Sequence, residues 1–251
     1  MGLFDLFKSK PKGKDGEATT KKSNAAAKYA EAAASKRAQA YDRQEALHEL
    51  VKLKSADAAE ALLRRFTFAV DPSITDQEEK DLAFEGVVAA GKDAIEPVRA
   101  FAAKAESVAW PMRILKELVD EEGFVDELLV WLAKWDTDYA KFIDPKLQIL
   151  DSLGDYKNPK IRPAVAPFLE DVDDRARFNA VVAVLKQEEP EGLDPLINCL
   201  LEEESVRIKA KIADGIAQLG WEIPDERRDA VRKVLPYEFG IDGSGRITKR
   251  G

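Results

Sequence analysis

The sequence predicts an all-α protein built from one helical unit used repeatedly, and three observations lead to that prediction. The first is composition, because the 251 residues are 45% hydrophobic and 34% charged, and common helix formers dominate. The second is a basic residue that recurs at intervals of 30 to 37 residues. The third is a proline that recurs near the start of alternate helical stretches.

We call the recurring basic residues the anchors. An alanine or isoleucine stands three residues after most anchors, and a valine or leucine seven residues after most of them. This spacing places the apolar side chains on one face of a helix. Arg113 departs from the pattern, because Lys116 and Asp120 take the two positions, and Asp214 takes the second position after Arg207. The anchors are Arg43, Lys80, Arg113, Lys146, Arg177 and Arg207.

The second helix of each unit has its own signal, an isoleucine or leucine two residues before a proline. It occurs in AIEPV (Ala94–Val98), KIRPA (Lys160–Ala164) and GLDPL (Gly192–Leu196). Proline suits the first turn of a helix, where its missing N–H would have no partner anyway. A period of this length with two helices predicts an α-solenoid, because a single pair cannot bury both of its apolar faces.

The run DSLGDYKNPKIRPAVAPFLEDVDDRARFNAVVAVL (Asp151–Leu185) resembles HEAT repeats, in particular the short bacterial form of the phycobilisome lyases. LGD at Leu153–Asp155 and SVRIKA at Ser205–Ala210 match that form well. The resemblance covers roughly residues 41–236. It implies a right-handed α-solenoid of about five to six HEAT-like helical pairs.

The resemblance also implies a ladder of ion pairs between neighbouring repeats, in which an acidic turn residue meets the basic residue entering the second helix. Asp173 or Asp174 is placed to pair with Arg177. Glu204 is placed to pair with Arg207. A phosphate- or carboxylate-binding row on the concave face is the alternative role for these side chains. The expected ladder residues are Arg113, Lys146, Arg177, Arg207, Asp173, Asp174 and Glu204.

The sequence offers no catalytic or metal-binding constellation, so we expect no enzyme and no cofactor. His48 is the single histidine, and one His-Glu pair cannot supply the several pairs by which the HEAT-like deoxyhypusine hydroxylases hold iron. Cys199 is the single cysteine, which excludes an intramolecular disulfide and a CxxC site; we expect a buried, inert thiol. Neither a GxSxG elbow nor a glycine-rich phosphate loop occurs.

One aromatic cluster leaves two interpretations open. Trp131 and Trp135 are four residues apart, and Tyr139 and Phe142 follow in WLAKWDTDYAKFID. Spacing of four on a helix favours packing in the core. An exposed patch that binds a partner is the alternative.

The N-terminal residues 1–23 are predicted to be a flexible basic tail with a short amphipathic tip. The tip would dock on an anionic membrane surface or in a partner's groove, and a plain flexible start is the alternative. Residues 24–40 are predicted to be an alanine-rich lead-in helix capped by Asn24. The solenoid then covers 41–236, and 237–251 form a tail or a hairpin. The tip residues expected to make contact are Leu3, Phe4, Leu6, Phe7, Lys8 and Lys10.

The distribution of charge along the chain indicates which classes of partner are expected. Residues 1–40 carry a net charge of +5 and the remainder −13, so the body repels phosphate backbones and nucleic acid is not an expected partner. No apolar stretch is long enough to cross a bilayer, and we expect a cytoplasmic protein or one peripheral at the inner membrane surface. The expected function is a non-enzymatic scaffold or adaptor that binds a protein with a basic surface on its concave face.

Two alternatives to the scaffold come from the resemblance. The first is a chaperone-like chromophore lyase subunit, since phycobilisome lyases share these repeats. The second is a HEAT-like DNA glycosylase, which uses a basic concave groove; the net negative charge of residues 41–251 counts against it.

Overall fold

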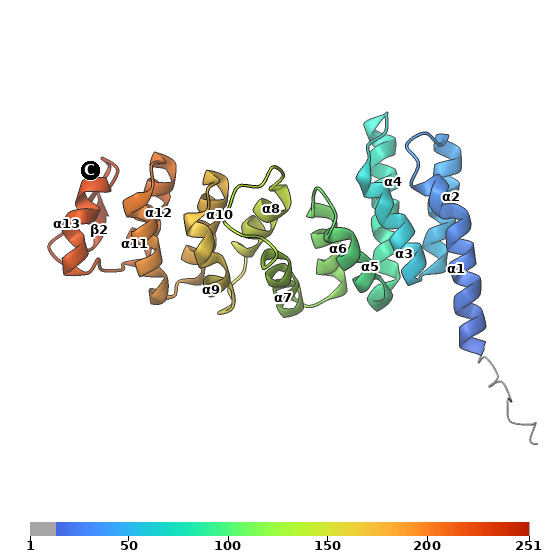
Figure 1. The fold of residues 1–251 in the computed structure, drawn as a ribbon, viewed down its shortest axis with the longest axis horizontal. Helices are drawn as coiled ribbons and strands as arrows, with labels where there is room; N and C mark the ends of the chain where they lie inside the picture. Colours follow the sequence, from blue (N-terminus) through green and yellow to red (C-terminus); the bar gives the residue numbers. More distant parts are fainter. Residues whose placement is uncertain (1–13, 251) are drawn as a thin grey trace, which may run out of the picture. The chain divides into compact units, whose positions relative to one another are not determined.

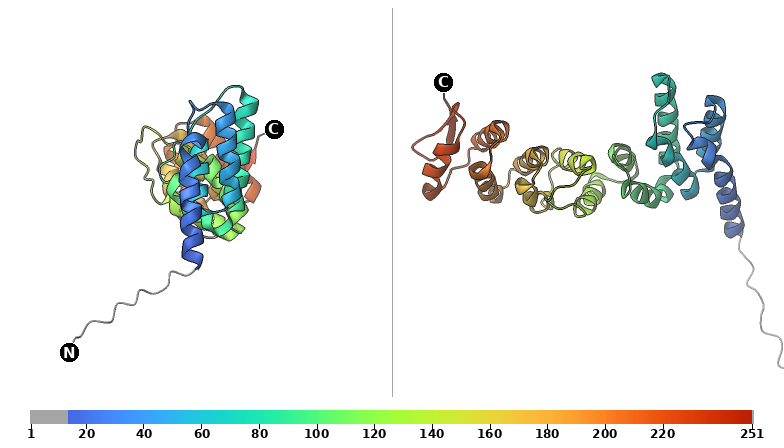
Figure 2. Two further views of the ribbon diagram at one scale, coloured as in Figure 1. Left: turned by 90° about the vertical axis from the view of Figure 1, so that its right-hand side faces the viewer. Right: turned by 45° about the horizontal axis from the view of Figure 1, so that its top comes forward.

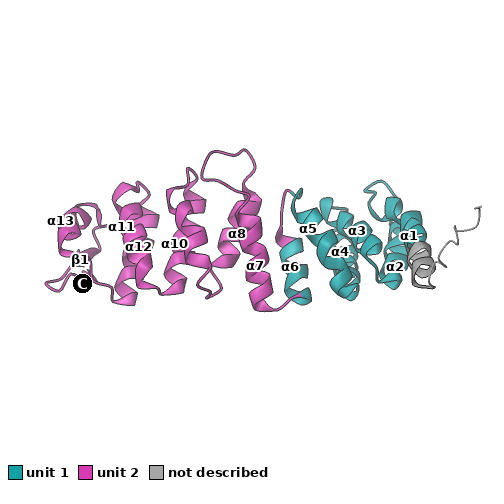
Figure 3. Ribbon diagram, turned by 60° about the horizontal axis from the view of Figure 1, so that its bottom comes forward, with its two compact units in different colours: residues 1–105, 110–118 teal, residues 106–109, 119–251 magenta. Residues whose placement is uncertain are grey.

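The computed structural model describes the backbone of residues 14–250 and the side chains of residues 23–250. α-Helices dominate this part of the chain, with four short 3-10 helices and one two-stranded sheet (Figure 1). The predicted all-α class is therefore confirmed. The chain divides into two compact units (Figure 3): unit 1 comprises residues up to Ala105 with Trp110–Leu118, and unit 2 comprises Glu106–Ala109 with Val119–Gly251.

Unit 1 is built from helices that pack in two rows. Helix α2 packs on α4 in one row, while α3 packs on α1 and α5 in the other. The rows meet where α3 packs on α2 and α4. The elements are α1 (Lys14–Ala33), α2 (Ala40–Leu53), α3 (Ala56–Leu63), η1 (Arg64–Thr67), α4 (Ser73–Ala89), η2 (Gly91–Ala94), α5 (Ile95–Ala102) and α6 (Ala109–Leu118), whose first residue belongs to unit 2.

Unit 2 repeats this arrangement. Helix α10 packs between α8 and α12, and α11 packs against η3 and α13 on the other side. The helices are α7 (Glu121–Leu132), α8 (Asp144–Leu153), α9 (Ile161–Val165), η3 (Ala166–Glu170), α10 (Asp174–Gln187), η4 (Pro190–Gly192), α11 (Leu193–Glu202), α12 (Val206–Leu219) and α13 (Asp225–Val234).

A β-hairpin follows α13. Strands β1 (Phe239–Ile241) and β2 (Ile247–Lys249) pair antiparallel, with Ile241 opposite Ile247, and the hairpin lies beside α13 (Figure 2). The turn between them is held by Asp242, whose carboxylate accepts hydrogen bonds from the N–H groups of Ser244 and Arg246. Of the two forms expected for residues 237–251, the structure adopts the hairpin.

The apolar positions that follow the anchors form the core, as the spacing predicts. These side chains are buried except that of Ala210, three residues after Arg207, which is half-buried, and those seven residues after an anchor have no exposed surface. The buried positions three residues after the anchor are Ala46, Ala83, Ile149 and Ala180, and those seven residues after it are Leu50, Val87, Leu153 and Val184. The recurring prolines also take the expected place, since Pro97, Pro163 and Pro195 are each the third residue of their helix.

The boundaries predicted for the N-terminal region are wrong in two respects. Helix α1 begins at Lys14, so part of the predicted flexible tail is helical and Asn24 lies inside the helix instead of capping it. The helix also ends at Ala33, and a turn over residues 34–39 separates it from α2. Helix α1 packs on α2 and α3 with Ala26 and Ala33 buried. Packing explains the second difference, because the Arg43 guanidinium donates to the Ala38 carbonyl at 2.9 Å and so holds the turn that follows α1.

Candidate functional site

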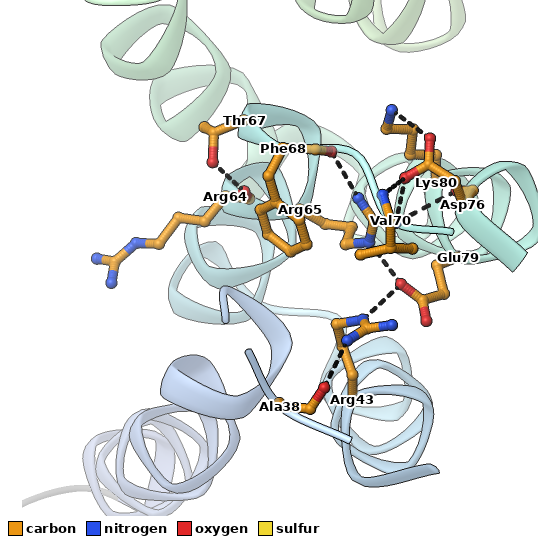
Figure 4. A network of polar contacts seen from close by, with 10 residues as sticks. All are labelled: Ala38, Arg43, Arg64, Arg65, Thr67, Phe68, Val70, Asp76, Glu79 and Lys80. Atoms are coloured by element: carbon orange, nitrogen blue, oxygen red, sulfur yellow. Dashed lines mark hydrogen bonds and ion pairs between the residues drawn. The ribbon is translucent and has the colours of Figure 1, made fainter. Parts of the chain in front are cut away.

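Buried ion pairs that join neighbouring helices of one row are the main polar feature of the structure. In unit 1, Arg43 of α2 and Arg65 of η1 each donate from Nε to the same Oε2 atom of Glu79 on α4, both at 2.7 Å (Figure 4). The three side chains are at most 4% exposed. Two cations therefore share one buried carboxylate, which ties α2, η1 and α4 together.

A second carboxylate, Asp76, completes this network. It accepts hydrogen bonds from Arg65 Nη2 at 2.7 Å, Lys80 Nζ at 2.7 Å and the backbone N–H of Val70 at 2.9 Å (Figure 4). Burial alone would raise the pKa of Asp76, but these donors outweigh it and lower the pKa from 3.8 to about 2. The anchor Lys80 thus pairs within its own helix, while Asp76 fixes the loop that precedes α4.

Unit 2 carries two ion pairs that are equivalent to one another. Lys146 of α8 donates to Asp171 at 2.6 Å, and Arg177 of α10 donates to both oxygens of Glu203 at 2.7 and 2.9 Å. Each carboxylate stands three residues before the next helix of the row. Each also accepts the backbone N–H two residues further on, from Asp173 and from Ser205 respectively, at 2.9 Å. One acidic residue therefore shapes the turn and binds the preceding anchor.

The pKa values of the second pair reflect this arrangement. Burial would raise the pKa of Glu203, but the Arg177 guanidinium and the N–H groups of Ser205 and Glu204 hold it below its ordinary value. The pKa of Arg177 is raised in turn, chiefly by its hydrogen bond to Glu203. Both groups stay charged over the physiological pH range.

The partners predicted for two anchors are wrong, although the ladder between helices exists. Arg177 does not pair with Asp173 or Asp174. The Asp173 carboxylate caps α10 by accepting from Arg175 N at 3.0 Å and also pairs with the Arg175 side chain. A capping carboxylate faces its own helix start, so Asp173 does not reach the Arg177 guanidinium. In the turn before α12, the acidic residue that binds an anchor is Glu203 and not Glu204, and that anchor is Arg177.

Two anchors contact aromatic rings instead of the expected carboxylates. The guanidinium carbon of Arg207 lies 3.8 Å from the centroid of the Phe178 ring, in place of the pair expected with Glu204. Arg113 lies over Phe84 at 4.6 Å and over Trp110 at 5.0 Å. Cations over ring faces are attracted by the ring quadrupole. These anchors therefore link helices through rings, whereas Arg43, Lys146 and Arg177 use carboxylates.

The aromatic cluster divides between the two interpretations left open. Trp131 is buried in α7 and Trp135 is half-buried, whereas Tyr139 is 83% and Phe142 68% exposed. The exposed pair lies in the loop between α7 and α8. This loop borders a hollow of about 260 Å³, whose lining includes Asp138, Tyr139, Lys141, Val172 and Arg175. The spacing of these residues could not predict which of them are buried and which are exposed. Helix α7 ends at Leu132, so Trp131 lies in the helix while Trp135, Tyr139 and Phe142 lie beyond it.

The single cysteine is buried, as expected, and the single histidine is exposed. His48 is on the exposed side of α2. Cys199 is buried in α11, and its pKa is raised to about 11, first by burial and then by the charge of Glu203. The thiolate is therefore disfavoured. Within residues 23–250, no group of three or more His, Cys, Asp or Glu side chains is arranged to hold a metal ion.

The tip residues singled out in the sequence lie outside the described residues, so their contact role stays a prediction. They are Leu3, Phe4, Leu6, Phe7, Lys8 and Lys10. Among the helices that the structure describes, none has the length and hydrophobicity needed to pass through a membrane.

Comparison with known proteins adds no relative. Neither the protein-family models, nor the curated proteins, nor the solved structures gave a match to this chain.

Proposed function

We propose that this chain is a non-enzymatic scaffold or adaptor whose helices stack as a HEAT-like α-solenoid and bind a protein partner. The observation that supports it best is one contact that recurs. In this contact, an anchor binds the acidic residue that stands three residues before the next helix of its row. This contact occurs twice in unit 2, between Lys146 and Asp171 and between Arg177 and Glu203. A repeated connection of this kind is expected where each unit packs only on its neighbours.

The proposed binding surface is the concave helical face. Residues 41–251 carry a net charge of −13, which steers a partner with a basic surface toward the protein and disfavours polyanions. The buried cations stabilise the stack, namely the anchors Arg43 and Lys146 together with Arg65. Arg43, Arg65 and Lys146 are at most 3% exposed and already bound to carboxylates, so these side chains do not serve as an anion-binding row.

The N-terminal segment is proposed as a second contact, to a partner protein or to an anionic membrane surface. Its sequence places four large apolar residues ahead of Lys8, Lys10, Lys12 and Lys14. This is the pattern of segments that bind weakly through a few buried side chains and nearby cations.

Two measurements test the proposal. Small-angle scattering should give a radius of gyration well above the roughly 18 Å expected of a compact domain of this length. Affinity capture from the cells of origin should recover a basic partner, and raising the salt concentration should release it. A compact particle would contradict the solenoid. A partner retained equally at low and high salt would contradict the electrostatic recognition.

A further inference from the structure

An edge of unit 2 exposes large apolar side chains at the start of each helix in one row. Tyr139 and Phe142 lie in the loop before α8, Val172 lies in the turn before α10, and Val206 is the first residue of α12. Their exposed fractions are 83%, 68%, 60% and 68%. We call these four residues the apolar edge.

Hydrogen bonds hold the segments of the apolar edge next to one another. The N–H of Val172 donates to the carbonyl of Thr137 at 3.1 Å, which fixes the turn before α10 against the loop before α8. Arg177 donates to the carbonyl of Val172 at 3.3 Å and to the Glu203 carboxylate, which joins that turn to the start of α12. The apolar side chains of the edge therefore stand on adjoining segments, and two of them, Tyr139 and Val172, line the same hollow.

Acidic side chains surround this surface. The segments 133–146, 170–177 and 202–207 carry ten carboxylates against six Lys or Arg, a net charge of −4. Three of the six cations, Lys146, Arg175 and Arg177, are bound to carboxylates. The occupant that fits is a short segment with large apolar residues followed by cations.

The chain itself contains a segment of that chemistry. Residues 1–14 read MGLFDLFKSKPKGK, with Leu3, Phe4, Leu6 and Phe7 in a cluster and a net charge of +3 from four lysines and one aspartate. We propose that the N-terminal segment of one chain docks on the apolar edge of a second copy. This inference rests on the second contact of the proposed function and names its partner.

Such a contact joins two different surfaces, so it is heterologous and links chains head to tail. A segment of about a dozen residues buries less than the area of a stable dimer interface, so the association is weak and depends on concentration. The lysines and the carboxylates around the edge make it weaker as salt rises.

A complementation experiment on the full chain tests the proposal. The segment variant carries Phe4→Ser and Phe7→Ser, and the edge variant carries Tyr139→Ser and Phe142→Ser. Each variant alone should self-associate about tenfold or more weakly than the unaltered chain. An equimolar mixture of the two, one of them carrying a fluorescent label, should form heterodimers in sedimentation experiments, because one variant supplies an intact edge and the other an intact segment.

The matched control carries Val130→Ser and Tyr237→Ser, which remove two apolar side chains of comparable exposure outside the edge, and it should associate like the unaltered chain. Circular dichroism should give the same helix content for all four proteins. An unaltered chain that stays monomeric, or variants that fail to complement one another, would overturn the proposal.

Two further measurements, binding to anionic vesicles and capture of the partner protein, distinguish a failure of this inference from a failure of the proposed function. A segment variant that loses vesicle binding while the mixture shows no heterodimer would assign the segment to membranes and overturn the docking. Loss of partner capture with heterodimers retained would contradict the scaffold and leave the docking intact.

Discussion

Arg177 of α10 donates two hydrogen bonds to the carboxylate of Glu203, a residue 26 positions further along the chain, and so fastens α10 to the start of α12. The Glu203 side chain is 1% exposed, whereas that of Arg177 is 21% exposed. Removing the cation would therefore leave a buried carboxylate with only backbone donors.

We expect Arg177→Ala to lower the free energy of unfolding by about 1–3 kcal/mol, because the charge of Glu203 would stay buried with no cation beside it. Arg175→Ala is the matched control. Its side chain is 57% exposed in the pair with Asp173, so its loss should change the free energy by less than about 1 kcal/mol. Urea denaturation of both variants checks the difference. Equal effects would show that the Arg177 pair is not a structural fastening.

The shared carboxylate of unit 1 should be more sensitive still. Glu79→Gln keeps the shape of the side chain but removes the charge that faces Arg43 and Arg65, so we expect a loss of about 3–5 kcal/mol. Glu78→Gln changes the neighbouring residue, which is exposed, and should shift the free energy of unfolding by no more than about 0.5 kcal/mol. Denaturant titration at neutral pH measures both. A Glu79→Gln protein as stable as the control would refute this role of Glu79.

Asp76 should make the free energy of unfolding depend on pH in the acidic range. Its folded pKa of about 2 lies below the ordinary value of 3.8, so its contribution is complete above the unfolded pKa and is lost as the pH falls from about 4 to about 2. The shift corresponds to about 2 kcal/mol at neutral pH. We expect Asp76→Asn to be less stable by about that amount at neutral pH and to lose less stability on acidification. Parallel slopes for the two proteins in this pH range would contradict the assignment.

A backbone effect should appear at the end of α12. Gly220 ends that helix with φ of 65°, a left-handed conformation that costs other residues about 1–2 kcal/mol. No atom lies within 4 Å of the position that a Cβ would take. Gly220→Ala should therefore destabilise the protein by about 1 kcal/mol through conformation alone. Gly243→Ala, where a Cβ also meets open space and no positive φ is required, should have little effect in the same thermal melts.

Periodic burial could be predicted from the sequence, because a helix repeats its buried face every three to four residues. Leu50 and Val184 illustrate this, since their distance from an anchor was enough to place them in the core. The choice between Asp171 and Asp173 could not be predicted in the same way. Both lie in one turn, and which of them caps the helix and which binds the preceding anchor depends on the folded turn.

A usable signal for the ladder nevertheless exists in the two turns. EDVDD at residues 170–174 and EEESV at residues 202–206 each place an acid three residues before the first helical residue. The contact of Arg207 with Phe178 had no such signal, because a cation near a ring and a cation near a carboxylate look alike in sequence. The exposure of Tyr139 and Phe142 could not be predicted either, because it depends on where α7 ends. Helix ends are set by packing as much as by propensity.

The separation of the bonded residues along the chain bears on how the protein folds. The pairs Arg43–Glu79, Lys146–Asp171 and Arg177–Glu203 join residues only 36, 25 and 26 positions apart. Closing such short loops costs little entropy, and chains whose contacts are local fold quickly. During synthesis Arg43, Lys146 and Arg177 can each bind their carboxylate once the next helix of the row has left the ribosome, without waiting for distant parts of the chain.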